Sequence, residues 1–231
     1  ILVILSFVLC ITSYAQPLPE GCRISLLTVD VGNELHSLFG HSALRVQTPA
    51  GDDIIWNWGV FTWGDSDFDF AMKYARGRLK YQLAKEDYQD FIMQYEWENR
   101  SAWEVELNLT EQQKQDLWQA ILINYMPENR YYKYDFFYDN CATRIRDLIE
   151  KAIGSDLEWN HPDADQYTIR EIIDVNLSPQ PWTDFGVDLA LGAQIDELAD
   201  EREMMFLPSY VHDNAMNAKI GSKPLVKGEP I

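Results

Sequence analysis

Residues 41–61, HSALRVQTPAGDDIIWNWGVF, contain two stretches in which apolar and polar residues alternate, 41–47 and 53–61. Between them, residues 49–52 read PAGD, a combination typical of a tight turn. Two alternating runs around such a turn predict an antiparallel hairpin. The preceding run 23–29, RISLLTV, is rich in apolar residues and β-formers and predicts a core strand. We therefore expect the N-terminal part of the protein to form an antiparallel sheet.

Helical periodicity follows the hairpin. Residues 86–99 and 111–125 repeat apolar side chains every three or four positions. Thr110 precedes the second run and Gln113 lies three places further on, which is the pattern of a capping box. The same periodicity predicts a helix over 141–153. Segregated strands and helices are typical of the α+β fold class.

The remaining segments give weaker signals. Residues 131–139, YYKYDFFYD, predict an extended aromatic run. The Pro- and Asp-rich region 155–184 is expected to be loop, and 187–206 to be helical. Residues 207–231 are expected to be irregular.

Residues 1–15 are apolar and end in Ser-Tyr-Ala, with small residues at the two positions that define a cleavage site. This pattern predicts a secretory signal peptide, because the run is shorter than the ~20 residues a membrane span needs. We expect residues 16–210 to form an exported catalytic domain and 211–231 to be a C-terminal connector. After cleavage, Cys22 and Cys141 are the cysteines left, and two cysteines in an oxidising compartment invite a disulfide.

The net charge is −18 and no basic cluster occurs, which argues against nucleic acid as a partner. We expect no cofactor and no metal, since no His-Glu-x-x-His zinc motif and no phosphate-binding glycine loop is present. The acidic stretch 65–69, DSDFD, superficially resembles a calcium loop. However, Phe70 stands where that loop requires glycine, and Arg76 stands where it requires glutamate. A solvated turn is the expected structure.

Cys141 is the first candidate for chemistry. Asn140 is a favoured N-cap residue, so Cys141 should lie in the first turn of the helix 141–153. Free N–H groups and the helix dipole there favour an anion, which predicts a lowered thiol pKa and a place for a developing oxyanion. The alternatives are an inert buried cysteine and a disulfide to Cys22.

His41 is the candidate base for this thiol. Strand alternation puts His41 on one face of the hairpin and Asn57 within its reach, whether paired positions sum to 98 or to 100. Asn57 would then orient the imidazole, as in a Cys–His–Asn arrangement. The alternative is a strand histidine and asparagine that only satisfy each other. Asn140 and Arg144 are candidates for oxyanion or substrate binding, although an ion pair on the helix face is the expected role of Arg144.

Three segments carry a resemblance to a known family: FGHSALRV at 39–46, WNWGVF at 56–61 and PENRYYKYDFFYDNCATRIRD at 127–147. Together with shorter motifs between residues 24 and 210, they resemble the Lnb N-terminal periplasmic domain family. That family is in turn similar to permuted papain-like proteins, in which the histidine strand precedes the cysteine helix. The resemblance implies a permuted papain-like core, with a small antiparallel sheet packed on helices and further helices added.

The resemblance also implies a function. Cys141 would be the nucleophile and His41 the base of a periplasmic acyltransferase. An acyl chain would pass from a phospholipid, through a cysteine thioester, to the N-terminal amine of a lipoprotein. Relatives continue into membrane helices, so a membrane tether beyond the connector is expected. Two alternatives stay open: an amidase or peptidase acting on cell-wall peptides, and a non-catalytic secreted binding domain with a bridge between Cys22 and Cys141.

Overall fold

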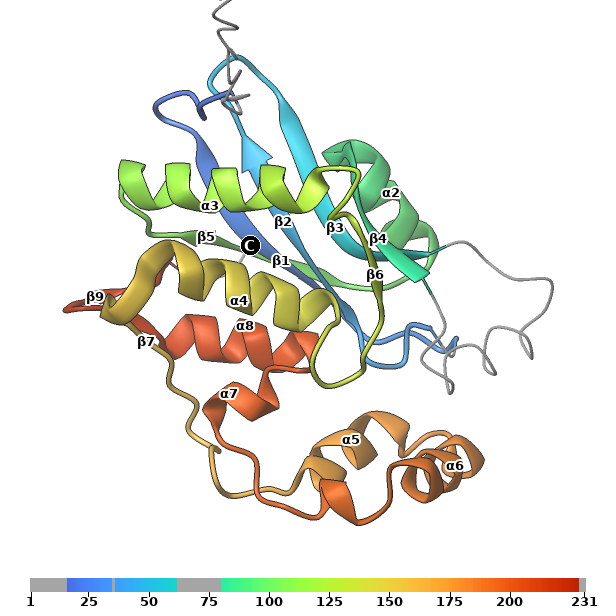
Figure 1. The fold of residues 1–231 in the computed structure, drawn as a ribbon. Helices are drawn as coiled ribbons and strands as arrows, with labels where there is room; N and C mark the ends of the chain where they lie inside the picture. Colours follow the sequence, from blue (N-terminus) through green and yellow to red (C-terminus); the bar gives the residue numbers. More distant parts are fainter. Residues whose placement is uncertain (1–15, 35, 62–79, 229–231) are drawn as a thin grey trace, which may run out of the picture.

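The computed structural model describes residues 16–34, 36–61 and 80–228. The expected signal peptide at 1–15 and the acidic stretch at 65–69 lie outside the described residues. An antiparallel sheet forms the centre of the molecule, and helices pack against both of its faces (Figure 1). The fold class is therefore α+β, as predicted.

Seven strands of the described chain form the main sheet in the order β10-β5-β1-β2-β3-β4-β6, and every pairing is antiparallel. Their bounds are β1 Arg23–Val29, β2 His41–Gln47, β3 Asp53–Phe61, β4 Lys80–Asp87, β5 Ala102–Leu107, β6 Tyr131–Lys133 and β10 Val226–Lys227. The predicted hairpin β2–β3 is confirmed at the expected bounds. Leu44 lies opposite Trp56, so paired positions sum to 100.

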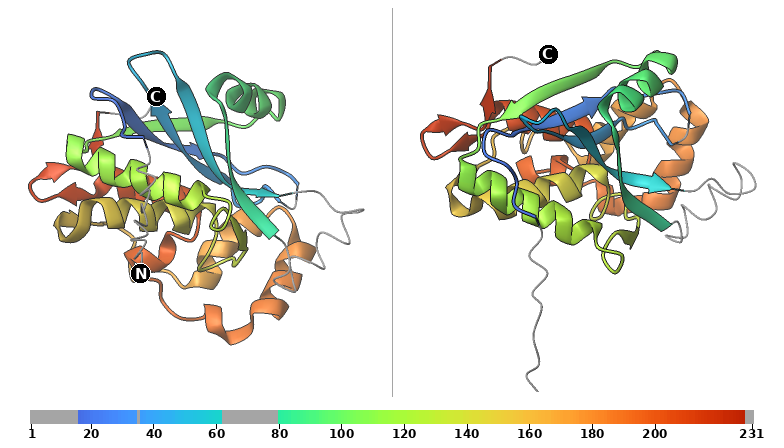
Figure 2. Two further views of the ribbon diagram at one scale, coloured as in Figure 1. Left: turned by 45° about the horizontal axis from the view of Figure 1, so that its top comes forward. Right: turned by 90° about the horizontal axis from the view of Figure 1, so that it is seen from above.

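Alternation along the strands supplies two hydrophobic cores. On one face, Leu44 and Trp56 pack against helices α3 (Glu111–Tyr125), α4 (Cys141–Ile153) and α8 (Pro208–Asn217). On the other face, Ala43 and Ile55 pack against α2 (Tyr88–Trp97). The two views of Figure 2 show α2 on the opposite side of the sheet from α3 and α4. Each face of the hairpin therefore contributes to a different layer.

The helices predicted over 86–99, 111–125 and 141–153 are confirmed, with one shift of boundary. Thr110 and Gln113 form the predicted capping box of α3, and α4 occupies the predicted residues. Helix α2 begins only at Tyr88, because the two residues before it still belong to strand β4. The aromatic run 131–139 is extended only in β6; Asp135 and Asp139 close a turn after it through two backbone hydrogen bonds.

Three predictions for the C-terminal third are wrong, and two of them concern residues 155–206. The expected loop 155–184 contains helix α5 (Ile169–Leu177) and the start of α6 (Pro181–Leu191). A capping box of Thr168 and Glu171 begins α5 in spite of the Pro- and Asp-rich surroundings. The predicted helix 187–206 is broken, with α6 followed by a 3₁₀ turn and the short helix α7 (Glu201–Met204).

The prediction that residues 207–231 are irregular is also wrong for the described part, 207–228. Helix α8 buries Val211 and Ala215 in the main core, and β10 pairs Val226 with Leu107 at the edge of the sheet. A small second sheet joins β7 (Leu157–Glu158), β8 (Lys219–Ile220) and β9 (Lys223–Pro224). The first part of the expected connector is thus packed on the domain.

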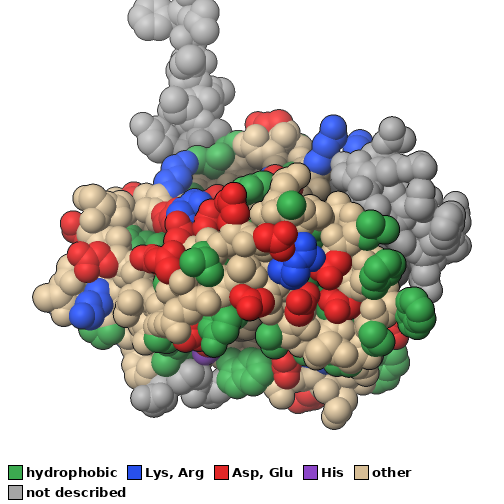
Figure 3. Space-filling view, turned by 90° about the horizontal axis from the view of Figure 1, so that it is seen from below, with side chains coloured by type: hydrophobic (Ala, Val, Ile, Leu, Met, Phe, Trp, Pro, Cys, Tyr) green, Lys and Arg blue, Asp and Glu red, His purple; other side chains and the backbone are tan. Residues whose placement is uncertain are grey.

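Helix α6 exposes an apolar face. Trp182, Phe185 and Leu189 lie three and four positions apart, and their exposed fractions are 87%, 63% and 76%. Figure 3 views the molecule from the side of α5 and α6, and acidic side chains are spread across that face. In the described ranges, no helix combines the length and the apolar character needed to cross a bilayer.

Candidate active site

Cys141 is the first residue of α4 and is held there by its neighbour. The Asn140 side chain accepts a hydrogen bond from the Thr143 backbone N–H at 2.9 Å and so caps the helix. Its Nδ2 donates to the carbonyl oxygens of Phe136 and Phe206, at 2.7 and 2.9 Å. Asn140 therefore fixes the loop before the thiol as well as the helix start. The side-chain amide of Asn140 is engaged in these three hydrogen bonds. A role of Asn140 in binding an oxyanion stays a prediction.

The thiol pKa expected from the helix position is wrong in direction. Burial raises the pKa of Cys141, although the backbone N–H groups of Ser42, Ala142 and Cys141 itself act to lower it. Desolvation of the thiolate is the larger effect, because the sulfur faces the interior of a pocket instead of open solvent. The resting sulfur is accordingly a thiol, with three donors already placed around it.

His41 begins strand β2 and is joined to a chain of hydrogen bonds. Its Nε2 lies 2.5 Å from Oδ1 of Asn57, the predicted partner. Nδ2 of Asn57 donates to Oε1 of Glu86 on β4 at 2.7 Å. Burial lowers the pKa of His41 to about 4, against the hydrogen bond that His41 donates to Asn57, which raises it. The imidazole is therefore neutral at pH 7.

The hydrogen bonds from Glu86 through Asn57 to His41 fix the tautomer of the imidazole. An ionised Glu86 can only accept, so Nδ2 of Asn57 must point to it and Oδ1 must point to His41. The nitrogen that donates to Oδ1 is then Nε2, which leaves Nδ1 of His41 with its lone pair. A neutral imidazole with a free Nδ1 lone pair is the protonation state that a general base requires.

Gly59 separates the thiol from the imidazole. A Cβ atom built on Gly59 would lie 3.5 Å from Cβ of Cys141 and 3.8 Å from Cε1 of His41. The φ angle of Gly59 is +86°, a conformation that favours glycine, and the β3–β4 register shifts beside it. Both side chains thus approach one point that a larger residue would fill. Among the described residues, no hydrogen bond joins Sγ to the imidazole; such contacts are often loose before substrate binds.

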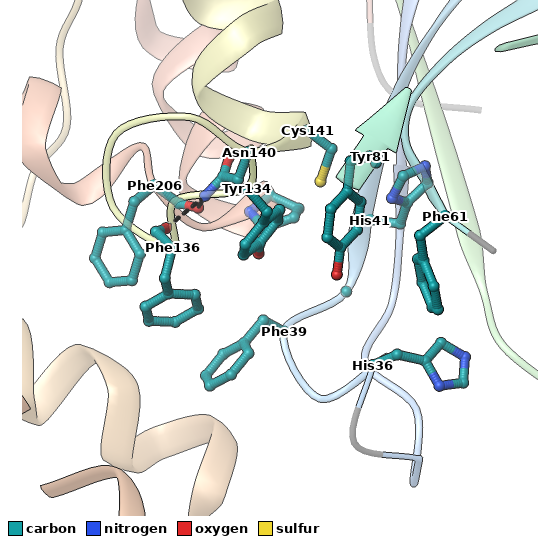
Figure 4. A pocket seen from close by; sticks show the side chains of 13 residues that line it. His36, Phe39, His41, Phe61, Tyr81, Tyr134, Phe136, Asn140, Cys141 and Phe206 are labelled. Carbon is teal, nitrogen blue, oxygen red and sulfur yellow. Dashed lines mark hydrogen bonds between the residues drawn. The ribbon is translucent and has the colours of Figure 1, made fainter. Parts of the chain in front are cut away.

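Two hollows meet at His41. The first, here the aromatic pocket, is about 70 Å³, contains Cys141 and is lined by Phe39, Phe61, Tyr81, Tyr134, Phe136 and Phe206 (Figure 4). The second, here the polar cleft, is about 310 Å³ and is lined by Asn57, Glu86, Gln94, Tyr95, Glu98 and Arg100. Both include His41, Gly40 and Gly59 in their walls. The aromatic pocket adjoins α4, whereas the polar cleft adjoins α2.

Arg144, the other predicted substrate-binding residue, lies outside both hollows. Its guanidinium donates to both carboxylate oxygens of Asp139, at 2.5 and 2.9 Å, and lies 3.6 Å from the centroid of the Tyr132 ring. This is the ion pair that the sequence favoured for Arg144. A role of Arg144 in binding an anion stays a prediction.

The two cysteines are not bridged. Both Cys22 and Cys141 are free thiols, and Cys22 is fully buried in the main core. Cys22 precedes β1 at the end where Arg23 pairs with Gln47, whereas Cys141 lies against the opposite end of β2, at His41. Seven strand residues span roughly 20 Å, far more than the ~7 Å limit between the Cα atoms of a disulfide. The disulfide-bridged alternative therefore disagrees with the structure.

Comparison with protein families matches residues 14–175 to the Lnb N-terminal periplasmic domain, which is most of the chain. The chain belongs to the Lnb N-terminal periplasmic domain family. The family description makes this a periplasmic domain. The matched residues include His41, Asn57, Glu86 and Cys141, so the three hydrogen-bonded side chains and the thiol all lie within the Lnb domain. No curated protein and no solved structure matched the chain in the same comparisons.

The aromatic run 131–138 was expected to wall a groove near Cys141, and Tyr134 and Phe136 do so; sequence reasoning missed Glu86 and the pocket rings that come from outside that run. Glu86 lies on β4, a strand that was not predicted, and 29 positions separate it from Asn57. Phe206 reaches the pocket from the end of the segment 187–206, for which the sequence predicted a helix and no part in the site. The one available signal was alternation in residues 80–87, which puts Gln82, Ala84 and Glu86 on one face of the strand.

Proposed function

We propose that this domain is a thiol-dependent acyltransferase of the periplasmic membrane surface. It takes an acyl chain from a phospholipid as a thioester on Cys141 and passes the chain to the N-terminal amine of a lipoprotein. The observation that carries the proposal is the approach of Cys141 and His41 to the same point beside Gly59, with the imidazole held by Asn57. Family membership supports it.

The proposed first half-reaction uses His41 as the base. Nδ1 of His41 takes the thiol proton while the sulfur attacks the ester carbonyl carbon of the lipid. The C–S bond forms, the tetrahedral oxyanion collapses, and the imidazolium protonates the departing lysolipid alkoxide. The backbone N–H groups of Cys141 and Ser42, which already point to the sulfur, are the proposed donors to the oxyanion.

The aromatic pocket favours an acyl substrate over a peptide. A peptidase needs an open polar cleft around its nucleophile, whereas Cys141 opens into a narrow space walled by aromatic rings. Rings such as Phe39 and Phe136, whose centroids lie 4.8 Å apart, suit the first methylenes of a fatty acyl chain and exclude water from a thioester. The exposed apolar face of α6 is compatible with work at a lipid surface.

The chain order also suits a permuted papain-like arrangement. His41 and Asn57 on a hairpin precede Cys141 at a helix start, and the helix packs on the same sheet. We propose that the domain is a permuted papain-like protein. The same order of histidine and cysteine also occurs in hydrolases, so it does not choose between transfer and hydrolysis.

Mass spectrometry of the purified protein after incubation with phosphatidylethanolamine in detergent micelles tests the proposal. We expect an acyl mass on the peptide that contains Cys141, removable by hydroxylamine and absent from Cys141→Ala. A free thiol in every sample, together with cleavage of cell-wall peptides, would replace the proposal by the amidase alternative.

A further inference from the structure

The polar cleft has no role in the first half-reaction, although it shares its wall with the thiol site. It contains two carboxylates, Glu86 and Glu98, and one guanidinium, Arg100. The guanidinium uses each of its three nitrogens as a donor: Nη1 donates to Glu98 at 2.8 Å, and Nε and Nη2 donate to the Asp30 carbonyl oxygen. Arg100 thus offsets the charge of Glu98, which leaves Glu86 as the carboxylate of the cleft without such a partner in the described ranges.

Glu86 is different, because it has no cationic partner among the described residues. Its Oε1 accepts from Asn57 at 2.7 Å, and the side chain lines the cleft. Burial raises the pKa of Glu86, and the nearby charge of Asp90 raises it further. The ionised carboxylate is therefore less stable in the cleft than it would be in water. A cation delivered into the cleft would offset that loss of stability.

We infer that the polar cleft binds the primary ammonium group of the acyl acceptor, with Glu86 as its counter-ion. The inference rests on the proposed function, because the ammonium is that of the amine to be acylated. Gly40 and Gly59 stand between the cleft and the aromatic pocket, and neither has a side chain to block the path to Cys141. An amine held beside Glu86 therefore has a short route to the thioester, past the imidazole.

The second half-reaction balances with these groups. The ammonium first releases one proton to solvent. A free terminal α-amine has a pKa near 8, and Glu86 raises that pKa while the ammonium is bound, so the neutral fraction of the amine is the species that reacts. The neutral nitrogen attacks the thioester carbonyl carbon, the C–N bond forms, and His41 takes a second proton from the nitrogen. The C–S bond then breaks, and the imidazolium returns that proton to the departing sulfur. The products are an amide and the original thiol.

The experiment separates the two half-reactions. Acyl-enzyme is prepared with phosphatidylethanolamine and then treated with a short lipopeptide that has a free N-terminal amine; water serves as a second, uncharged acceptor. In Glu86→Gln, the Asn57 contact survives because the amide oxygen still accepts. We expect the KM for the lipopeptide to rise at least about tenfold, as for loss of a charge-assisted contact, and to change by more than acylation or hydrolysis by water, which report the effect of Glu86 on the orientation of Asn57.

Glu96→Gln is the matched control, because Glu96 is exposed on α2 outside the cleft, and its lipopeptide KM should stay unchanged. An unchanged KM in Glu86→Gln would overturn the inference. Equal slowing of acylation, hydrolysis and aminolysis would overturn it as well, since Glu86 would then only position Asn57.

A failure of the proposed function is distinguishable from a failure of this inference. If wild-type protein forms no acyl-enzyme, binding of the lipopeptide to Cys141→Ala can still be measured by calorimetry. Weaker binding in the double variant Cys141→Ala/Glu86→Gln would keep the ammonium site, and equal binding would overturn it.

Discussion

The aromatic pocket and the polar cleft share His41 and Gly59 in their walls but are opposite in chemistry. The pocket on the α4 side has aromatic rings around a half-buried thiol, and desolvation of its charged form keeps that thiol protonated. The cleft on the α2 side has a carboxylate without a cationic partner in the described part of the chain. One imidazole at the end of a strand thus faces an apolar and a charged compartment at once.

This division follows from the period of a β-strand. Successive side chains of β2 and β3 point to opposite faces, so the hairpin supplies Trp56 to the main core and Asn57 to the cleft. Near the end of β3, Gly59 has no side chain, so Cys141 on one side of the sheet and His41 on the other come close to the same point. A two-substrate reaction needs such a meeting point, whereas a simple buried cysteine does not.

The largest expected effect comes from removing the thiol of the aromatic pocket or the imidazole that both hollows share. Cys141→Ala and His41→Ala should each lower acyl transfer at least about a thousandfold, because the thiol and the base act as one unit. Transfer is measured by mass spectrometry of the acylated lipopeptide, and circular dichroism checks the fold. Activity above a tenth of the wild-type value in either variant would assign the chemistry to other residues.

The pairing of His41 with Asn57 was predictable, because alternation alone puts both on one face in either register of the hairpin. The position of Cys141 was predictable for a similar reason, since Asn140 and the periodicity after it define a capped helix. These inferences needed only local sequence and a short turn.

Glu86 and the direction of the thiol pKa were not predictable in this way. Glu86 reaches Asn57 through a strand pairing whose register shifts between Asn57 and Val60, and no periodicity fixes such a shift. The pKa of Cys141 depends on its burial, and the pocket around it includes the rings of Phe39, Phe61, Tyr81 and Phe206, which are all distant in sequence. Helix position alone gave the smaller of two opposing effects, and therefore the wrong direction.

A methyl group at the meeting point tests whether the two hollows communicate. In Gly59→Ala the new Cβ would stand between Cys141 and His41, and we expect acyl transfer to fall about a hundredfold. The positive φ adds a backbone cost of about 1–2 kcal/mol. Gly51→Ala is the matched control: Gly51 also has a positive φ, but a Cβ there has no neighbour within 4 Å. Equal activity per folded molecule in the two variants would refute the shared passage.

The pH dependence of alkylation tests whether Cys141 rests as a neutral thiol in the aromatic pocket. The pKa of Cys141 is raised and that of His41 is lowered to about 4, so at pH 5–7 both groups are neutral. The rate of iodoacetamide reaction at Cys141 should therefore rise about tenfold per pH unit from pH 6 to 8. Peptide mapping separates this signal from Cys22, which is fully buried. A rate that is constant from pH 5 to 7 would indicate a preformed thiolate–imidazolium pair instead.

The smallest expected effect concerns the apolar character of the pocket. Phe136→Ala removes a ring that packs against Phe39 and Phe206, but it keeps the backbone carbonyl that accepts from Asn140. We expect kcat/KM for a long-chain acyl donor to fall about tenfold while that for an acetyl donor stays within about twofold, since only the longer chain contacts the missing ring. Tyr138→Ala, at an aromatic residue that is 80% exposed, should leave both values unchanged. Equal losses with both donors would mean that Phe136 supports the loop before Cys141 and does not select the chain, and the pocket would then differ from the cleft only in polarity.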